Sequence, residues 1–212
     1  IQHCEEALTV HTREAFPEDW AMNQNNLANA YSERILGERA ENLERAIQHC
    51  EEALTVQTRE ALPQDWAMTQ SNLAIAYSER IRGEREENLE RAIKHCEKAL
   101  TVYTREAFPQ HWAATQNNLA NAFSQRIRGE RAENLERAIK HCEEALTVYT
   151  HEAFPERWAG IQNNLAIAFR NRINGERAEN LERAIKHCEE ALEIFTCQAF
   201  PRGHRDTQAI LG

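Results

Sequence analysis

The sequence predicts an all-α solenoid in which short helical hairpins stack one after another. The first observation is a sequence repeat: cysteines and prolines recur every 46 residues along the 212-residue chain. They are Cys4, Cys50, Cys96, Cys142 and Cys188, and Pro17, Pro63, Pro109, Pro155 and Pro201. The second observation is that apolar residues within one interval recur at helical spacing, without the alternation typical of a strand. Units of this size cannot bury a core alone, so we expect each to pack on its neighbours.

The prolines divide the chain into repeats. Four full repeats cover 17–62, 63–108, 109–154 and 155–200. Residues 1–16 read as the second helix of a partial repeat, and residues 201–212 as the start of a truncated one. Because the chain starts and stops inside repeats, we expect a piece of a longer array. We expect residues 1–212 to form a single solenoid without internal domain boundaries.

The first helix of a repeat is predicted from Pro17 to Gly37. Proline is favoured in the first turn, where its missing N–H costs nothing, and glycine suits the left-handed residue that ends a helix. The predicted apolar face comprises Trp20, Leu27, Tyr31 and Ile35. These residues are spaced by 7, 4 and 4, which places them on one side of a helix.

The second helix is predicted to begin after Asn42, a favourable N-cap, and to continue until Pro63. Its predicted apolar stripe comprises Leu43, Ala46, Ile47, Cys50, Ala53, Leu54, Thr58 and Ala61. The short connections predict antiparallel neighbours. We expect the first helices to line a concave groove and the second helices to lie outside.

Composition excludes several classes of partner. The net charge is −9 with a pI near 5.5, and arginine alternates with glutamate in GERAENLERA, so we expect no nucleic-acid binding. No apolar run approaches a membrane span, so we expect no membrane partner. Five of the six cysteines occupy one repeat position, too far apart in stacked units for disulfides. Reduced thiols predict a cytoplasmic protein.

The repeat resembles the tetratricopeptide repeat, whose pattern is W-x2-L-G-x2-Y, then A-x3-F-x2-A, then P. The matching positions are Leu27, Ala28 and Tyr31 in the first helix and Ala46, Cys50 and Ala53 in the second. Gln24 stands where the family has tryptophan. The long unit with its NNLA core is similar to arrays of kinesin light chain and of bacterial multidomain sensors. The resemblance implies a right-handed superhelix that binds a peptide or protein segment.

The resemblance also implies which side chains face the groove. One row comprises Asn25, Ser71, Asn117 and Asn163, and the next comprises Asn29, Ile75, Asn121 and Ile167. In related repeats, groove asparagines bond the backbone of an extended peptide, a role carried over to Asn25, Asn117 and Asn163. The alternative is that these amides, with the Gln24 and Asn26 rows, are solvated or bridge neighbouring helices. Both interpretations stay open for the Asn25 row, and the second is favoured for the Gln24 and Asn26 rows.

Charge changes along the array at the positions that differ between repeats. Glu33 and Glu79 give way to Gln125 and Asn171, whereas Arg157 and Arg170 appear only near the carboxyl end. We expect an oriented ligand whose basic residues lie toward the first repeats. Its acidic residues or carboxylate would lie toward Arg157 and Arg170.

Other patterns have ordinary structural interpretations. Adjacent His and Cys recur in every repeat, but neighbouring helical residues point about 100° apart. We therefore expect the cysteines to fill the core and the histidines to lie at the helix surface, without bound metal. The four tryptophans predict packing between repeats. Cys197 replaces a polar residue and predicts an exposed thiol.

No motif of catalytic chemistry is present, so we expect neither enzymatic activity nor a cofactor. The sequence favours a peptide-binding scaffold. An alternative is a structural array that assembles head to tail, as a homo-oligomer through exposed repeat ends. A spacer or sensor segment within a larger signalling protein is a further alternative.

Overall fold

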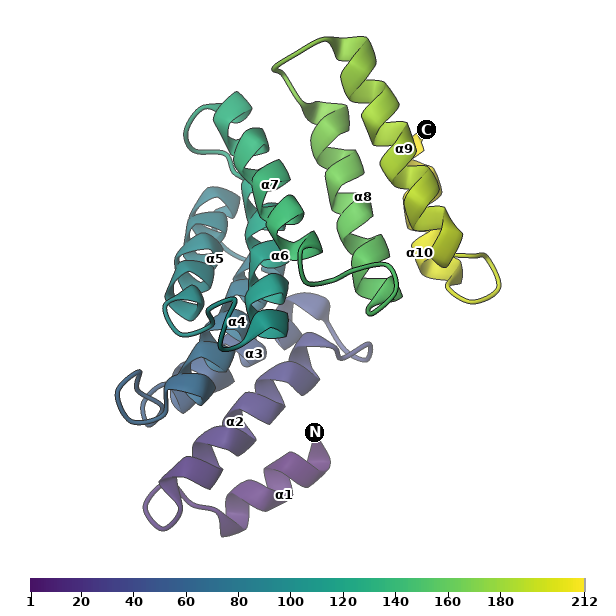
Figure 1. Cartoon of the computed structure of the whole chain (residues 1–212). Helices are drawn as coiled ribbons and strands as arrows, with labels where there is room; N and C mark the ends of the chain where they lie inside the picture. The colour runs from purple at the N-terminus through teal and green to yellow at the C-terminus, as the bar shows by residue number, and fades with distance from the viewer. Residues whose placement is uncertain (212) are drawn as a thin grey trace. The chain divides into compact units, whose positions relative to one another are not determined.

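A computed structural model describes residues 1–211, which fold into ten α-helices without a strand (Figure 1). The helices are α1 (Gln2–Val10), α2 (Pro17–Ser32), α3 (Arg39–Ala53), α4 (Pro63–Glu79), α5 (Arg85–Leu100), α6 (Pro109–Gln125), α7 (Arg131–Leu146), α8 (Pro155–Asn171), α9 (Arg177–Ile194) and α10 (Pro201–Leu211). The predicted all-α fold of sequential antiparallel hairpins is confirmed.

The chain divides into two compact units, one spanning Ile1–Thr104 and the other beginning at Arg105. In the first unit, the hairpins α2–α3 and α4–α5 pack together through α3 against α4 and through α2 against α4. In the second unit, α6–α7 and α8–α9 pack in the same way, and α10 contacts both α8 and α9. Each unit therefore contains two helical hairpins and the contact between them.

The first helix of each repeat begins at its proline, as the sequence predicts, but it ends earlier than predicted. In the first repeat, α2 ends at Ser32, and the predicted terminal residue Gly37 lies in the following loop with φ +83°. Ile35 was predicted to belong to the apolar face, and that prediction is wrong because the loop leaves it 95 % exposed. The left-handed glycine turns the chain between the two helices rather than capping the first.

The start of the second helix also differs from the prediction. Helix α3 begins at Arg39, so Asn42 lies inside its first turns rather than at the N-cap. The buried Asn42 side chain donates from Nδ2 to the carbonyl of Leu36 at 3.0 Å. The amide thereby fixes the loop against the helix. Asn88, Asn134 and Asn180 do the same in the later repeats.

The second helix ends well before the next proline, contrary to the prediction. After Ala53, the backbone N–H groups of Thr55 and Val56 bond carbonyls three residues earlier, which tightens and ends the helix. Thr58 then accepts a hydrogen bond from the backbone N–H of Ala61 at 3.2 Å. Both residues are exposed and belong to a turn, so their assignment to the apolar stripe is wrong.

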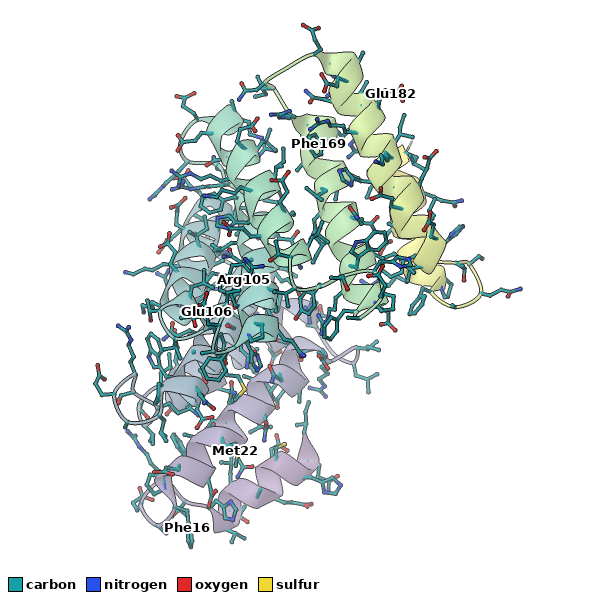
Figure 2. All side chains as sticks on the ribbon, in the orientation of Figure 1. Phe16, Met22, Arg105, Glu106, Phe169 and Glu182 are labelled. Atoms are coloured by element: carbon teal, nitrogen blue, oxygen red, sulfur yellow. The ribbon has the colours of Figure 1, made fainter. Side chains whose placement is uncertain are left out.

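The core repeats with the sequence. Leu27, Leu43, Leu73 and Leu89 are buried in the first unit, and Leu119, Leu135 and Leu165 in the second. Cys50 and its counterparts in the later repeats are buried beside them, and burial raises the pKa of the Cys50 thiol to about 12. These cysteines fill the core, as predicted. Phe169 of α8 faces α9, where its ring stacks on His187 (Figure 2).

Candidate functional site

Asparagine side chains join the first helices of successive repeats. In the first unit, Asn72 on α4 donates from Nδ2 to Oδ1 of Asn25 on α2 at 2.8 Å. In the second unit, Asn164 on α8 donates in the same way to Asn117 on α6 at 2.7 Å. The same pair thus recurs in both units. These amides hold neighbouring helices in register, so the bridging interpretation describes Asn72 and Asn164.

This arrangement determines how much of the first predicted row a ligand can reach. Asn25 has no exposed surface, so no ligand can contact its side chain in this structure. Asn163 exchanges hydrogen bonds with the hydroxyl of Thr207, at 2.8 and 3.0 Å. Ser71 and Asn117 are half-buried. The row therefore lies mainly at the contact between helices.

The second predicted row lies nearer to solvent. Ile75 is 37 % exposed and Asn29 is exposed, whereas Asn121 and Ile167 are half-buried. A pocket of about 220 Å³ opens between α2 and α4 beside this row. It is lined by Asn29, Ser32, Glu33, Asn72, Ile75 and Glu79. We call it the α2–α4 pocket.

The sequence identified only part of this pocket. Asn29 and Ile75 were assigned to the groove, and Glu33 and Glu79 were noted for their charge. Asn72 belongs to the Asn26 row, which was expected to be solvated or to bridge neighbouring helices; it bridges to Asn25 and also lines the pocket. Its double role follows from its position one residue past the Asn25 row, on the edge between the buried and exposed faces of α4.

The two carboxylates of the pocket differ in their partners. Glu79 forms an ion pair with Arg39, whose guanidinium also donates to the carbonyl of Ser32 at the end of α2. Among the described residues, the Glu33 side chain has no hydrogen bond or ion pair, although it lies at the end of the same helix. The pocket therefore has one carboxylate held by the chain and one available to a ligand.

The equivalent surface of the second unit keeps the amides and loses both carboxylates. Asn121, Ser124, Asn164 and Ile167 stand at equivalent positions, with Gln125 and Asn171 in place of the two glutamates. Asn171 donates from Nδ2 to the carbonyl of Ile167 at 2.9 Å. The two units thus present the same scaffold with different charge.

The two predicted arginines have different environments. Arg170 is half-buried and donates to the carbonyl of Ile210 on α10 at 2.9 Å. Arg157 is exposed near the start of α8 and lines a shallow, partly apolar depression with Phe154 and Pro155. Of these two arginines, Arg157 is the one whose side chain is exposed.

Of the five histidines that recur with the cysteines, His3 is exposed as predicted, whereas the four later ones are half-buried, which corrects the prediction for those four. Nδ1 of His49 donates to Oε1 of Gln24 at 2.6 Å, and its ring stacks on Tyr31. The same contact joins His95 to Gln70, His141 to Gln116 and His187 to Gln162. This glutamine, which stands where the tetratricopeptide pattern has tryptophan, therefore links the two helices of each hairpin, as the bridging interpretation proposes.

The structure also shows the surroundings of a repeated tryptophan and of Cys197. Trp112 packs against the core of the second unit, and Arg105 lies over its ring at 5.8 Å. Cys197 is exposed, as predicted.

Within residues 1–211, no group of three or more His, Cys, Asp or Glu side chains could hold a metal ion. Among residues 1–211, no helix combines the length and the apolar composition of a transmembrane span.

Comparison with known proteins assigns a family to one part of this array. No curated protein and no solved structure matches the chain. Residues 112–146, which run from Trp112 in α6 to the end of α7, match the family model described as Tetratricopeptide repeat. The match covers one hairpin of an array whose other hairpins repeat it at an interval of 46 residues. The chain is therefore an array of helical repeats that contains a tetratricopeptide repeat.

Proposed function

We propose that this chain is a protein–protein interaction scaffold that binds an extended peptide segment along the first helices of its repeats. The observation that carries the proposal is the α2–α4 pocket, which combines an exposed isoleucine with amide and carboxylate groups. An exposed Ile75 between polar side chains costs solvation free energy unless a ligand covers it. The match of one hairpin to the tetratricopeptide family supports a protein partner.

Asn29 and Asn121 are the asparagines we propose for contact with the ligand backbone. Both stand at the same repeat position, and each amide offers a donor and an acceptor to a peptide group. Asn117 retains this role in the proposal through its Nδ2, whereas Asn25 and Asn163 instead hold the helices that shape the groove. Reduced, mostly buried cysteines support a cytoplasmic location for this activity.

The test is selection of peptides from a displayed random nonapeptide library on the intact chain, followed by affinity measurement with Ile75→Ser. Removing the isoleucine side chain should weaken the selected peptides about tenfold, because the apolar area that it shares with a ligand is lost. Ile81→Ser is the matched control, since Ile81 is 61 % exposed but lies outside the pocket.

Failure to enrich any peptide, with circular dichroism showing an intact fold, would contradict the scaffold proposal. Equal weakening by the two isoleucine variants would place the binding surface elsewhere. Light scattering across protein concentration distinguishes the alternative of head-to-tail assembly, in which the mass grows with concentration. The scaffold proposal predicts a constant mass.

A further inference from the structure

We infer that the α2–α4 pocket selects a lysine or arginine side chain of the bound peptide. This inference rests on the proposed function and concerns its specificity. It depends on the shape of the pocket, on the groups that remain without partners, and on the contrast with the second unit.

The size of the pocket suits one side chain. Its volume of about 220 Å³ is smaller than the roughly 300–1,000 Å³ of pockets that hold small-molecule ligands. Lysine and arginine have long aliphatic stems that lie along apolar surface while their charged ends reach polar groups. Ile75 supplies such a surface within this pocket.

The pocket offers more hydrogen-bond acceptors than donors. Asn72 uses its Nδ2 to bond Asn25, which leaves its Oδ1 without a protein partner. The side-chain oxygens of Asn29, Ser32 and Glu33 also have no partner among the described residues. An ammonium or guanidinium group only donates, so its chemistry complements this set of oxygens.

The charge of the pocket favours a cation over a neutral donor. Arg39 neutralises Glu79 and also holds the carboxyl end of α2, so this cation is part of the framework. Glu33 is the carboxylate left without a counter-charge. A ligand cation beside it would form a charge-assisted hydrogen bond, which is stronger than one between neutral groups.

The second unit provides an internal contrast. Gln125 and Asn171 replace the two glutamates, while the asparagines and the isoleucine are retained. The amides alone are enough to contact a peptide backbone. Because carboxylates occupy these two positions in the first unit only, they point to selection of a particular peptide side chain by that unit. The first unit is therefore assigned the basic residue of the peptide.

The experiment uses peptides selected on the intact chain, each synthesised with its basic residue or with uncharged norleucine at that position. Fluorescence anisotropy then measures the affinity of each pair for the unmodified chain, for Glu33→Gln and for Glu38→Gln. Glu38 is exposed and lies outside the pocket, so the second variant controls for the loss of one negative charge.

We expect the selected peptides to share a lysine or arginine at one position. Replacing the basic residue by norleucine should weaken binding to the unmodified chain about fivefold. The same replacement should have little effect on binding to Glu33→Gln. Added salt should weaken the basic peptide on the unmodified chain and have less effect on Glu33→Gln. Glu38→Gln should behave like the unmodified chain.

The outcomes separate this inference from the proposed function. Peptides that bind through Ile75 without a shared basic residue would overturn the inference and leave the scaffold in place. Equal losses for Glu33→Gln and Glu38→Gln would also overturn it, because the effect would then come from net charge. If no peptide is selected, the scaffold proposal fails and the inference fails with it.

Discussion

The two compact units have nearly the same framework and different groove surfaces. Both have two repeats joined by an asparagine pair, Asn72 with Asn25 and Asn164 with Asn117. The first unit places two glutamates beside its pocket, whereas the second places Gln125 and Asn171 at the equivalent positions. The comparison distinguishes residues that hold the helices together, which are the same in both units, from residues on the groove surface, which differ between the units.

The largest expected effect tests whether the frameworks are equivalent. Leu73 in the first unit and Leu165 in the second occupy the same repeat position and are 1 % and 2 % exposed. Leu73→Ala and Leu165→Ala should each reduce the free energy of unfolding by about 3 kcal/mol, through lost burial and the cavity left behind. Urea unfolding followed by circular dichroism measures both. Costs that differ by more than about 1 kcal/mol would show that the two cores are not equivalent.

A smaller effect is expected in the loops between the two helices of a repeat. Gly83 and Gly175 have φ values of +79° and +80°, a region that disfavours any residue with a Cβ. The nearest neighbours of an added Cβ would lie at 3.6 and 3.8 Å, so there is space and only the conformation opposes the change. Gly83→Ala and Gly175→Ala should each cost about 1–2 kcal/mol by thermal or urea unfolding.

Gly160 provides the matched control for these loop variants. It lies within α8, and an added Cβ would meet nothing within 4 Å. Gly160→Ala should therefore stabilise the chain by up to about 1 kcal/mol. If all three variants changed stability equally, the left-handed conformation would not be the cause.

One ion pair in each unit joins the two hairpins of that unit. Arg80 binds both carboxylate oxygens of Glu44 at 2.8 and 2.7 Å, and Arg172 binds Glu136 at 2.8 and 3.0 Å. Both pairs are partly exposed, so Glu44→Gln and Glu136→Gln should each cost below about 1 kcal/mol at neutral pH. Glu41→Gln, which removes a more exposed pair with Arg45, is the control and should cost less.

These ion pairs predict a dependence on acid. The hydrogen bond from Arg80 holds the pKa of Glu44 below its usual value of 4.5, and Arg172 does the same for Glu136. The stabilisation is present above pH 4.5 and is lost as the pH falls through the lowered pKa of the folded state. Urea midpoints of the glutamine variants should therefore converge on that of the unmodified chain in acid. A constant difference across this range would contradict the assignment.

The smallest expected effect concerns the repeated histidines. Burial, aided by Lys98 and Lys94, lowers the pKa of His95 to about 4. At the position of Lys98, the second unit has Glu190, which opposes the lowering of the pKa of His187 by burial. Lys98→Glu should therefore raise the pKa of His95, measured by NMR titration of its ring signals. An unchanged pKa would mean that Lys98 does not contribute to the lowered pKa of His95.

The regular framework was predictable because it depends on local sequence patterns that occur in all four full repeats. The prolines located the start of the first helices, and the apolar spacing located Leu27 and Cys50 in the core. The ends of the helices were harder to predict. They depend on tertiary contacts, such as the Asn42 amide that reaches back to Leu36, which spacing alone does not reveal.

The groove was only partly predictable for a related reason. An asparagine at a groove position can bond a ligand or a neighbouring helix, and the sequence is the same in both cases. Asn25 is enclosed because Asn72 packs against it, whereas Asn29, one turn later, remains exposed. Glu79 of the α2–α4 pocket is also paired with Arg39 from another helix, a contact that no spacing within α2 indicates.

The most direct test of the central claim is an NMR titration of the intact chain with a selected basic peptide, following side-chain amide signals. We expect the signals of Asn29 and Asn72 to shift first and most strongly, and those of Asn121 and Asn164 to respond less because their unit lacks the glutamates. Equal shifts in both units, or shifts confined to residues outside the α2–α4 pocket, would contradict it.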